Sequence, residues 1–214
     1  MKIVTARLPK DLPVLAHLRQ LILGDETLAA AVVRNDDISQ LVAKSFTASE
    51  LRLEKVNATQ AKLEKTSFSD VELLNCDLIA TALPDASWRR VTVKNSRCSG
   101  LQLQTSTLRD VSFIGCKLNL ANFRFSKLTN ICFEDCILDE ADFYAAELQN
   151  VVFLKCTLNQ TEFSGSKLKR VDFRTSDIIS LRGIGSLAGA IIDSSQLVTL
   201  APLLASVLKI EVKD

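Results

Sequence analysis

Large apolar side chains recur at almost every fifth position from Leu63 to Ile178, and the residue two positions earlier is usually small or β-branched. The position between the two is usually polar, as with Asn122 between Ala121 and Phe123. This is the alternation of a short strand, whose flanking side chains point to the same side. The two residues after each large apolar residue are often polar and predict a turn. A short strand and a turn repeated at a fixed period predict a solenoid.

A second period of ten residues overlies the first, because the large apolar positions alternate between Phe and Leu or Ile. This alternation indicates an even number of sides in each turn of the solenoid. The aromatic positions are Phe113, Phe123, Phe133, Phe143, Phe153, Phe163 and Phe173, and the aliphatic ones are Leu118, Leu128, Leu138, Leu148, Leu158, Leu168 and Ile178.

With these repeats the chain closely resembles the pentapeptide-repeat family, whose loose consensus is Ala-(Asp/Asn)-Leu-x-x. The segments that begin at Cys76, Ala121 and Ala141 are good matches. The resemblance implies an all-β solenoid, a right-handed quadrilateral β-helix with four pentapeptides, and so twenty residues, in each coil. Each residue should then stack on the residue twenty positions later, at a strand spacing of about 4.8 Å. One such column would be Val71, Val91, Val111, Ile131, Val151 and Val171.

The ends of a β-helix expose strand edges and need caps. We expect an N-terminal cap over residues 1–32, the β-helix over 33–180 and a helical C-terminal cap over 181–214. In the first cap, Asp11 would N-cap a short helix that contains Pro13 and ends at Gly24.

The C-terminal cap should begin where the five-residue register slips by one position across Gly183 and Gly185. Asp193 and Gln196 form a candidate capping box for an apolar helix that Pro202 would kink or divide. Ile210 and Val212 would add a last strand. Some family members dimerise through this end, so the resemblance implies a candidate homodimer interface.

Six cysteines raise the question of a metal or a disulfide. Cys76, Cys116, Cys136 and Cys156 fall in one predicted inward column, and the chain lacks the close C-x2-C pairs of a typical zinc site. We predict that the inward cysteines are small core residues, with a soft metal bound to the thiol column as the alternative.

No catalytic constellation is recognisable. The only histidine, His17, lies in the predicted N-terminal cap, away from any nucleophile it could activate. The glycines from Gly183 to Gly189 fit no phosphate-binding motif. We therefore predict a non-enzymatic protein without cofactor or metal.

Composition indicates a folded chain with a balanced charge. Apolar residues make up 47% of it, and the formal net charge is +1. Charged residues interrupt the apolar runs near the start, so we expect no secretory signal. No stretch is apolar enough to cross a bilayer. We expect a cytoplasmic protein.

One predicted side of the solenoid is basic. It presents seven cations, against only Asp110 and Glu147, and so could attract an anionic partner. The alternative is a solvated surface whose charges pair in ladders, such as Lys127-Glu147-Lys167 and Asp70-Arg90-Asp110. Trp88 either packs inward or turns outward to anchor a partner. The candidate interaction face is Trp88, Arg89, Arg90, Arg109, Lys127, Lys167, Lys169 and Arg170.

The function that follows is that of an interaction or scaffold protein, whose flat faces bind a macromolecular partner. The resemblance suggests one alternative, since some members protect bacterial gyrase from quinolones by imitating DNA with an acidic surface. The balanced charge departs from that pattern. The other alternative is binding of nucleic acid through the basic face, which should weaken steeply with salt.

Overall fold

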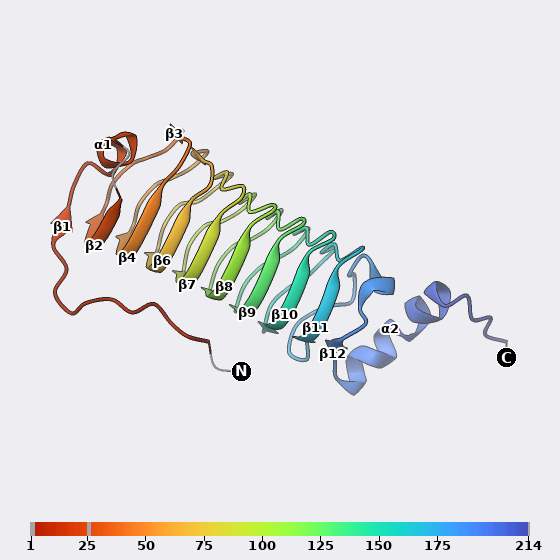
Figure 1. The fold of residues 1–214 in the computed structure, drawn as a ribbon. Coiled ribbons are helices and arrows are strands. Elements are labelled where there is room, and N and C mark those ends of the chain that lie inside the picture. The colour runs from red at the N-terminus through yellow and green to blue at the C-terminus, as the bar shows by residue number, and fades with distance from the viewer. Residues whose placement is uncertain (1–2, 25–26, 214) are drawn as a thin grey trace.

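The computed structural model describes residues 3–24 and 27–213. Its elements follow one another along the axis of a rod (Figure 1). The elements are β1 (Val14–Leu15), α1 (Leu18–Leu23), β2 (Leu28–Arg34), β3 (Val42–Ala43), β4 (Thr47–Glu54), β5 (Lys62–Leu63), β6 (Ser67–Leu74), β7 (Ser87–Lys94), β8 (Thr107–Ile114), β9 (Lys127–Glu134), β10 (Glu147–Leu154), β11 (Lys167–Asp172), the 3-10 helix η1 (Ile184–Ser186), β12 (Ala190–Ile191) and α2 (Ser194–Val207).

The strands form a parallel solenoid. A ten-stranded sheet runs in the order β1-β2-β4-β6-β7-β8-β9-β10-β11-β12, and Figure 1 shows its long strands side by side. Val111 pairs with Ile131, and Ile131 with Val151, so successive coils are twenty residues apart. The predicted solenoid and its stacking register are confirmed.

Each coil has four sides because the backbone turns at every fifth residue. From Ala30 to Arg170 every fifth residue except Ser45 has a positive φ, between 49° and 70°. We call residues 86–90 and their equivalents in other coils side 1, residues 91–95 side 2, residues 96–100 side 3 and residues 101–105 side 4. Asn, Asp and Gly tolerate this left-handed backbone best. They occupy many of the corners, but bulkier residues such as Thr105 and Phe125 occupy others.

The core is a file of stacked side chains. Rings of Phe113, Phe133, Phe153 and Phe173 stack at 4.9–5.1 Å, with interplanar angles of 8° or less. Phe123, Phe143 and Phe163 form the facing column at 4.8–5.1 Å. Rings of the two columns meet edge to face at 5.6–6.2 Å, an arrangement that aromatic quadrupoles favour.

The inward cysteines are buried core residues, as predicted. Their thiols donate weak hydrogen bonds to backbone carbonyls of the preceding coil. Cys136 Sγ lies 3.4 Å from the oxygen of Phe113, and Cys156 Sγ lies 3.4 Å from that of Phe133. Ser176, in the same column, makes the equivalent bond to Phe153 at 2.9 Å. The column is thus a series of small side chains that each satisfy one carbonyl.

The N-terminal cap differs from its prediction. Asp11 caps no helix, because it lies at a bend and is followed by β1, in which Val14 pairs with Val32. Helix α1 begins only at Leu18, whose backbone N–H donates to Asp36 Oδ2 at 2.7 Å. That carboxylate comes from the adjoining coil and satisfies one of the N–H groups left free at a helix start. The helix does end at Gly24, as expected.

At the C-terminal end the register slips by one residue. Val171 pairs with Ala190, nineteen positions on. Asp193 and Gln196 form the expected capping box, and Pro202 lies inside α2. The predicted last strand is wrong, because residues 210–213 belong to no strand.

Candidate interaction face

Trp88 belongs to the core and not to the interaction face. Its side chain is on β7, 1% exposed, stacked at 5.4 Å on Phe68. An indole fits here because the central residues of the next two sides of the coil are small. They are Val93 and Cys98, where the later coils carry Phe and Leu or Ile. Those two residues are the sequence signal that could have decided its orientation.

The region around Trp88 is less tightly filled than the Phe columns. A cavity of about 30 Å³ is lined by Phe68, Leu83, Trp88 and neighbouring aliphatic residues. The indole Nε1 has no hydrogen-bond partner within the described part of the chain. Burying an unpaired N–H costs stability, so Trp88 fills space here at a cost.

Arg90 is also removed from the candidate face. Its Nε donates to Asp70 Oδ1 at 2.6 Å, and its Nη2 contacts the other carboxylate oxygen. The charge of Arg90 is therefore not available to a partner, because Asp70 neutralises it and both side chains are largely enclosed. This pair is the first rung of the predicted Asp70-Arg90-Asp110 ladder. The column then continues as a hydrogen bond from Asn130 Nδ2 to Asp110 Oδ1 at 2.9 Å.

Six cations remain on the outside of side 1, and all are exposed: Arg89, Arg109, Lys127, Lys167, Lys169 and Arg170. Two have a carboxylate within ion-pair distance, Arg109 with Asp110 at 3.8 Å and Lys167 with Glu147 at 3.2 Å. Solvent weakens such exposed pairs to about 0–1 kcal/mol. We call these six residues the basic face.

The basic face also contains a groove. An open groove of about 270 Å³ runs across β9, β10 and β11, and Lys127, Gln149 and Lys169 line it. At the other end of the face, Arg89 and Arg109 are direct neighbours on β7 and β8. Cations therefore occupy both ends of the basic face, and its middle carries Lys127 and Thr129 beside Glu147 and Gln149.

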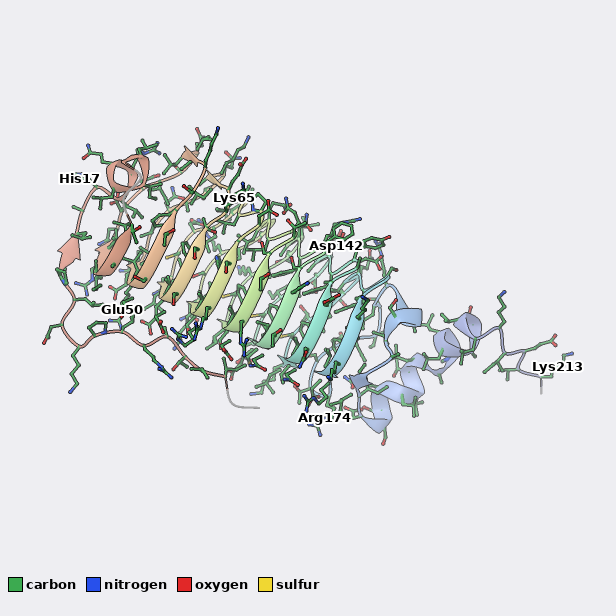
Figure 2. The ribbon with its side chains drawn as sticks, viewed as in Figure 1. His17, Glu50, Lys65, Asp142, Arg174 and Lys213 are labelled. Atoms are coloured by element: carbon green, nitrogen blue, oxygen red, sulfur yellow. The ribbon has the colours of Figure 1, made fainter. Side chains whose placement is uncertain are left out.

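An N-terminal segment, missed by the sequence reasoning, covers the earlier coils of side 1. Figure 1 shows the chain before β1 running back along one edge of the strands, and Glu50 lies on that edge in Figure 2. The backbone N–H of Arg7 donates to Asp70 Oδ1 at 2.9 Å. Side 1 carries small Ser49 and Ser69 in these coils, where the next coil carries Arg89. That change of size was the available signal.

The described residues, 3–24 and 27–213, hold no group of three His, Cys, Asp or Glu side chains that could bind a metal ion. His17 precedes α1, is exposed (Figure 2) and has a left-handed backbone conformation. Within the same residues, no helix has the length and apolar character to cross a membrane.

Four-sided coils, left-handed corners and a core of stacked Phe and Leu define a quadrilateral parallel β-helix built of five-residue units. Residues 106–182 match the family model of the pentapeptide repeat region. The resemblance drawn from the sequence is thereby confirmed for this part of the chain, and the coils continue on its N-terminal side with the same register.

Three solved structures show similarity. HetL, a pentapeptide repeat protein involved in heterocyst differentiation regulation from the cyanobacterium Nostoc sp. strain PCC 7120, is 14% identical, with 78% of this chain and 90% of that chain covered and a TM-score of 0.47. QnrB1, a plasmid-mediated fluoroquinolone resistance protein, is 15% identical at full length, with 90% and 94% covered and a TM-score of 0.36. A pentapeptide repeat protein of the Arabidopsis thaliana thylakoid lumen is 16% identical, with 79% and 77% covered and a TM-score of 0.19. No curated protein shows significant sequence similarity.

Proposed function

We propose that the protein is a non-enzymatic interaction protein, a rod whose basic face binds an acidic surface of a partner protein. The observation that carries the proposal is the set of six exposed cations on one side of a chain whose net charge is only +1. Strand pairing fixes their spacing, so little conformational entropy of the backbone is lost on binding. Charge of one sign on a fixed surface steers an oppositely charged partner and sets its orientation.

The test compares two fourfold charge reversals of the whole protein. One changes Arg89, Arg109, Lys127 and Lys169 to Glu. The matched control changes Lys44, Lys55, Lys65 and Lys155, which are exposed on other sides, to Glu. Each variant moves the net charge by −8, from +1 to −7. The probes are polyglutamate and a 20-base-pair DNA duplex, measured by fluorescence anisotropy at low and physiological salt.

We expect the face variant to lose binding to polyglutamate while the control retains most of it, because position and not total charge decides the contact. Equal loss in both variants would contradict the proposal. If the unmodified protein binds the DNA duplex more tightly than polyglutamate, the partner is instead a nucleic acid. Its affinity should then fall about a hundredfold between 50 and 200 mM salt if four phosphates are neutralised. The gyrase alternative requires an acidic surface, which the basic face does not offer.

The C-terminal cap carries a second candidate interaction, a homodimer. Helix α2, η1 and β12 enclose an open groove of about 320 Å³, lined by Ile184, Leu187, Leu204 and other apolar residues. The same helix exposes Val198 at 74%. An apolar groove beside exposed apolar side chains is a self-complementary surface, which a twofold interface requires. Val198→Asp should shift a concentration-dependent dimer to monomer in light scattering, while Ser194→Asp at the start of the helix should not. A monomer at all concentrations would contradict this interface.

The six cysteines are all unpaired. Free thiols are typical of a reducing compartment, which supports our placement of the protein in the cytoplasm.

A further inference from the structure

Side 4 carries a cluster of exposed aromatic rings that the basic face does not involve. Phe125 and Tyr144 are 52% and 38% exposed, and their rings meet edge to face at 5.7 Å. The guanidinium carbon of Arg124 lies 4.6 Å from the centre of the Tyr144 ring and 5.7 Å from that of Phe125. We call Arg124, Phe125 and Tyr144 the side-4 cluster.

The fold does not require Phe125. It stands at a corner with φ +59°, and the equivalent corners in the neighbouring coils are Asp85, Thr105, Ala145 and Gly165. A bulky residue in the left-handed region is costly, and the exposed ring gains little from burial. Every other described Phe is buried in the core. The residue therefore works against folding stability at a position that small or polar residues occupy elsewhere.

Carboxylates adjoin the cluster. Arg124 Nη1 is paired with Asp142 Oδ2 at 2.9 Å, so its charge is compensated. Asp142 lies on the edge of the rod away from Glu50 (Figure 2). Glu162 is the strand neighbour of Asp142, and exposed Glu140 belongs to the same coil as Tyr144. Within the described chain no cation lies within ion-pair distance of Glu140 or Glu162.

We propose that the side-4 cluster is a second docking site, for an extended segment of a partner protein that carries Lys or Arg beside an apolar side chain. The apolar side chain packs on the exposed faces of Phe125 and Tyr144. The Lys or Arg of the partner lies toward Glu140 and Glu162. It is thereby kept away from Lys127, which follows Phe125 on side 1 and would repel it. Aromatic rings attract cations through their faces, and Tyr and Arg are enriched among residues that dominate binding energy.

Tyr144 supplies a direct probe, because it is the only tyrosine of the chain. The full-length protein labelled with 3-fluorotyrosine should give one fluorine resonance, from the cluster itself. The ligand is a capped peptide of four Gly-Leu-Lys units. Two control peptides replace Lys by Glu, or Leu by Ser. We expect a saturable shift with the first peptide, at least about tenfold weaker binding when Ser replaces Leu, and no shift when Glu replaces Lys.

Phe125→Asn separates binding from folding. Asn tolerates positive φ, so the variant should be as stable as the unmodified protein or more stable, yet should lose the peptide-induced shift. Leu120→Asn is the matched control, since Leu120 is also exposed and left-handed but lies at the other corner of side 4. It should keep the shift. An unchanged resonance with the Gly-Leu-Lys peptide, equal shifts with the Glu peptide, or unimpaired binding by Phe125→Asn would overturn the proposal. The fourfold variant of the basic face should bind the peptide normally, which distinguishes the two sites.

Discussion

Arg90 and Asp70 form the most enclosed ion pair among the described residues, with side chains 14% and 10% exposed. Asp70 also accepts a hydrogen bond from the backbone of Arg7. One carboxylate thus joins two coils and anchors the N-terminal segment, and its hydrogen bond with Arg90 holds the pKa of Asp70 below the usual value of 3.8.

Replacing Asp70 by Asn should lower the free energy of unfolding by about 1–3 kcal/mol, because Arg90 loses its charged partner. Since the pKa is depressed in the folded state, the carboxylate stabilises the protein above its unfolded pKa, and this contribution is lost as pH falls through the folded value. The difference between the two proteins, measured by urea unfolding, should therefore be constant above about pH 5 and shrink below about pH 4. A difference independent of pH would contradict the assignment.

Two glycines at positive φ differ in the space around them. A Cβ on Gly165 would lie 3.8 Å from the backbone of Ala145, whereas one on Gly183 would lie 2.2 Å from the backbone nitrogen of Ser164. Gly165→Ala should cost about 1 kcal/mol, for the left-handed backbone alone. Gly183→Ala should cost about 3 kcal/mol or more, because the backbone of the last coil must move. Urea midpoints from circular dichroism provide the comparison, and equal losses would refute the close approach.

The thiols should react slowly in the folded protein. Burial raises the pKa of Cys76 to about 11, and burial with nearby Glu134 raises that of Cys132 to about 11. At pH 8 only about one such thiol in a thousand is a thiolate, the reactive form. Ellman's reagent should modify partly buried Cys132 first and all six thiols only after unfolding. Cys132→Ser is the control, and rapid modification of several native thiols would contradict the core assignment.

Trp88 should tolerate Phe better than Ala. Trp88→Phe removes the unpartnered N–H and keeps most of the ring contact with Phe68, so we expect a loss within about 1.5 kcal/mol. Trp88→Ala leaves a cavity and should cost about 3–5 kcal/mol. Calorimetry gives both values. Equal and negligible effects would mean that the indole does not pack in the core.

The regular coils could be predicted from the sequence because each position repeats the same environment every twenty residues. The alternation of Phe and Leu and the slip after Ile178 follow from spacing. The twenty-residue coil, which stacks the Phe rings and the thiols into columns, follows from the resemblance to the pentapeptide-repeat family. The Asp70-Arg90 and Glu147-Lys167 pairs were predicted as rungs of charge ladders and are present, whereas Arg90-Asp110 and Lys127-Glu147, stacked in the same way, are not among the ion pairs of the described residues.

The N-terminal helix, the N-terminal segment and the position of Trp88 depend on contacts that the repeat pattern does not show. Helix α1 starts at Leu18, where Asp36 from another coil accepts a hydrogen bond from the first backbone N–H of the helix. The sequence around Asp11 gives no sign of this contact. The N-terminal segment has no repeat, and only the small residues Ser49 and Ser69 on side 1 indicate where it packs. For the candidate face, the charge pattern identified the exposed cations. The orientation of Trp88 could be predicted only by also considering the small volumes of Val93 and Cys98.

Contact between side 1 and a macromolecular partner can be captured by a photocrosslinker introduced in the producing cells. Benzoylphenylalanine replaces Gln149, in the groove of the basic face, or Asn159, exposed on side 3. We expect one dominant crosslinked macromolecule from position 149 and none from position 159. The product from position 149 should be lost when Arg89, Arg109, Lys127 and Lys169 are changed to Glu. No product from position 149, or the same product from both positions, would contradict the proposed contact.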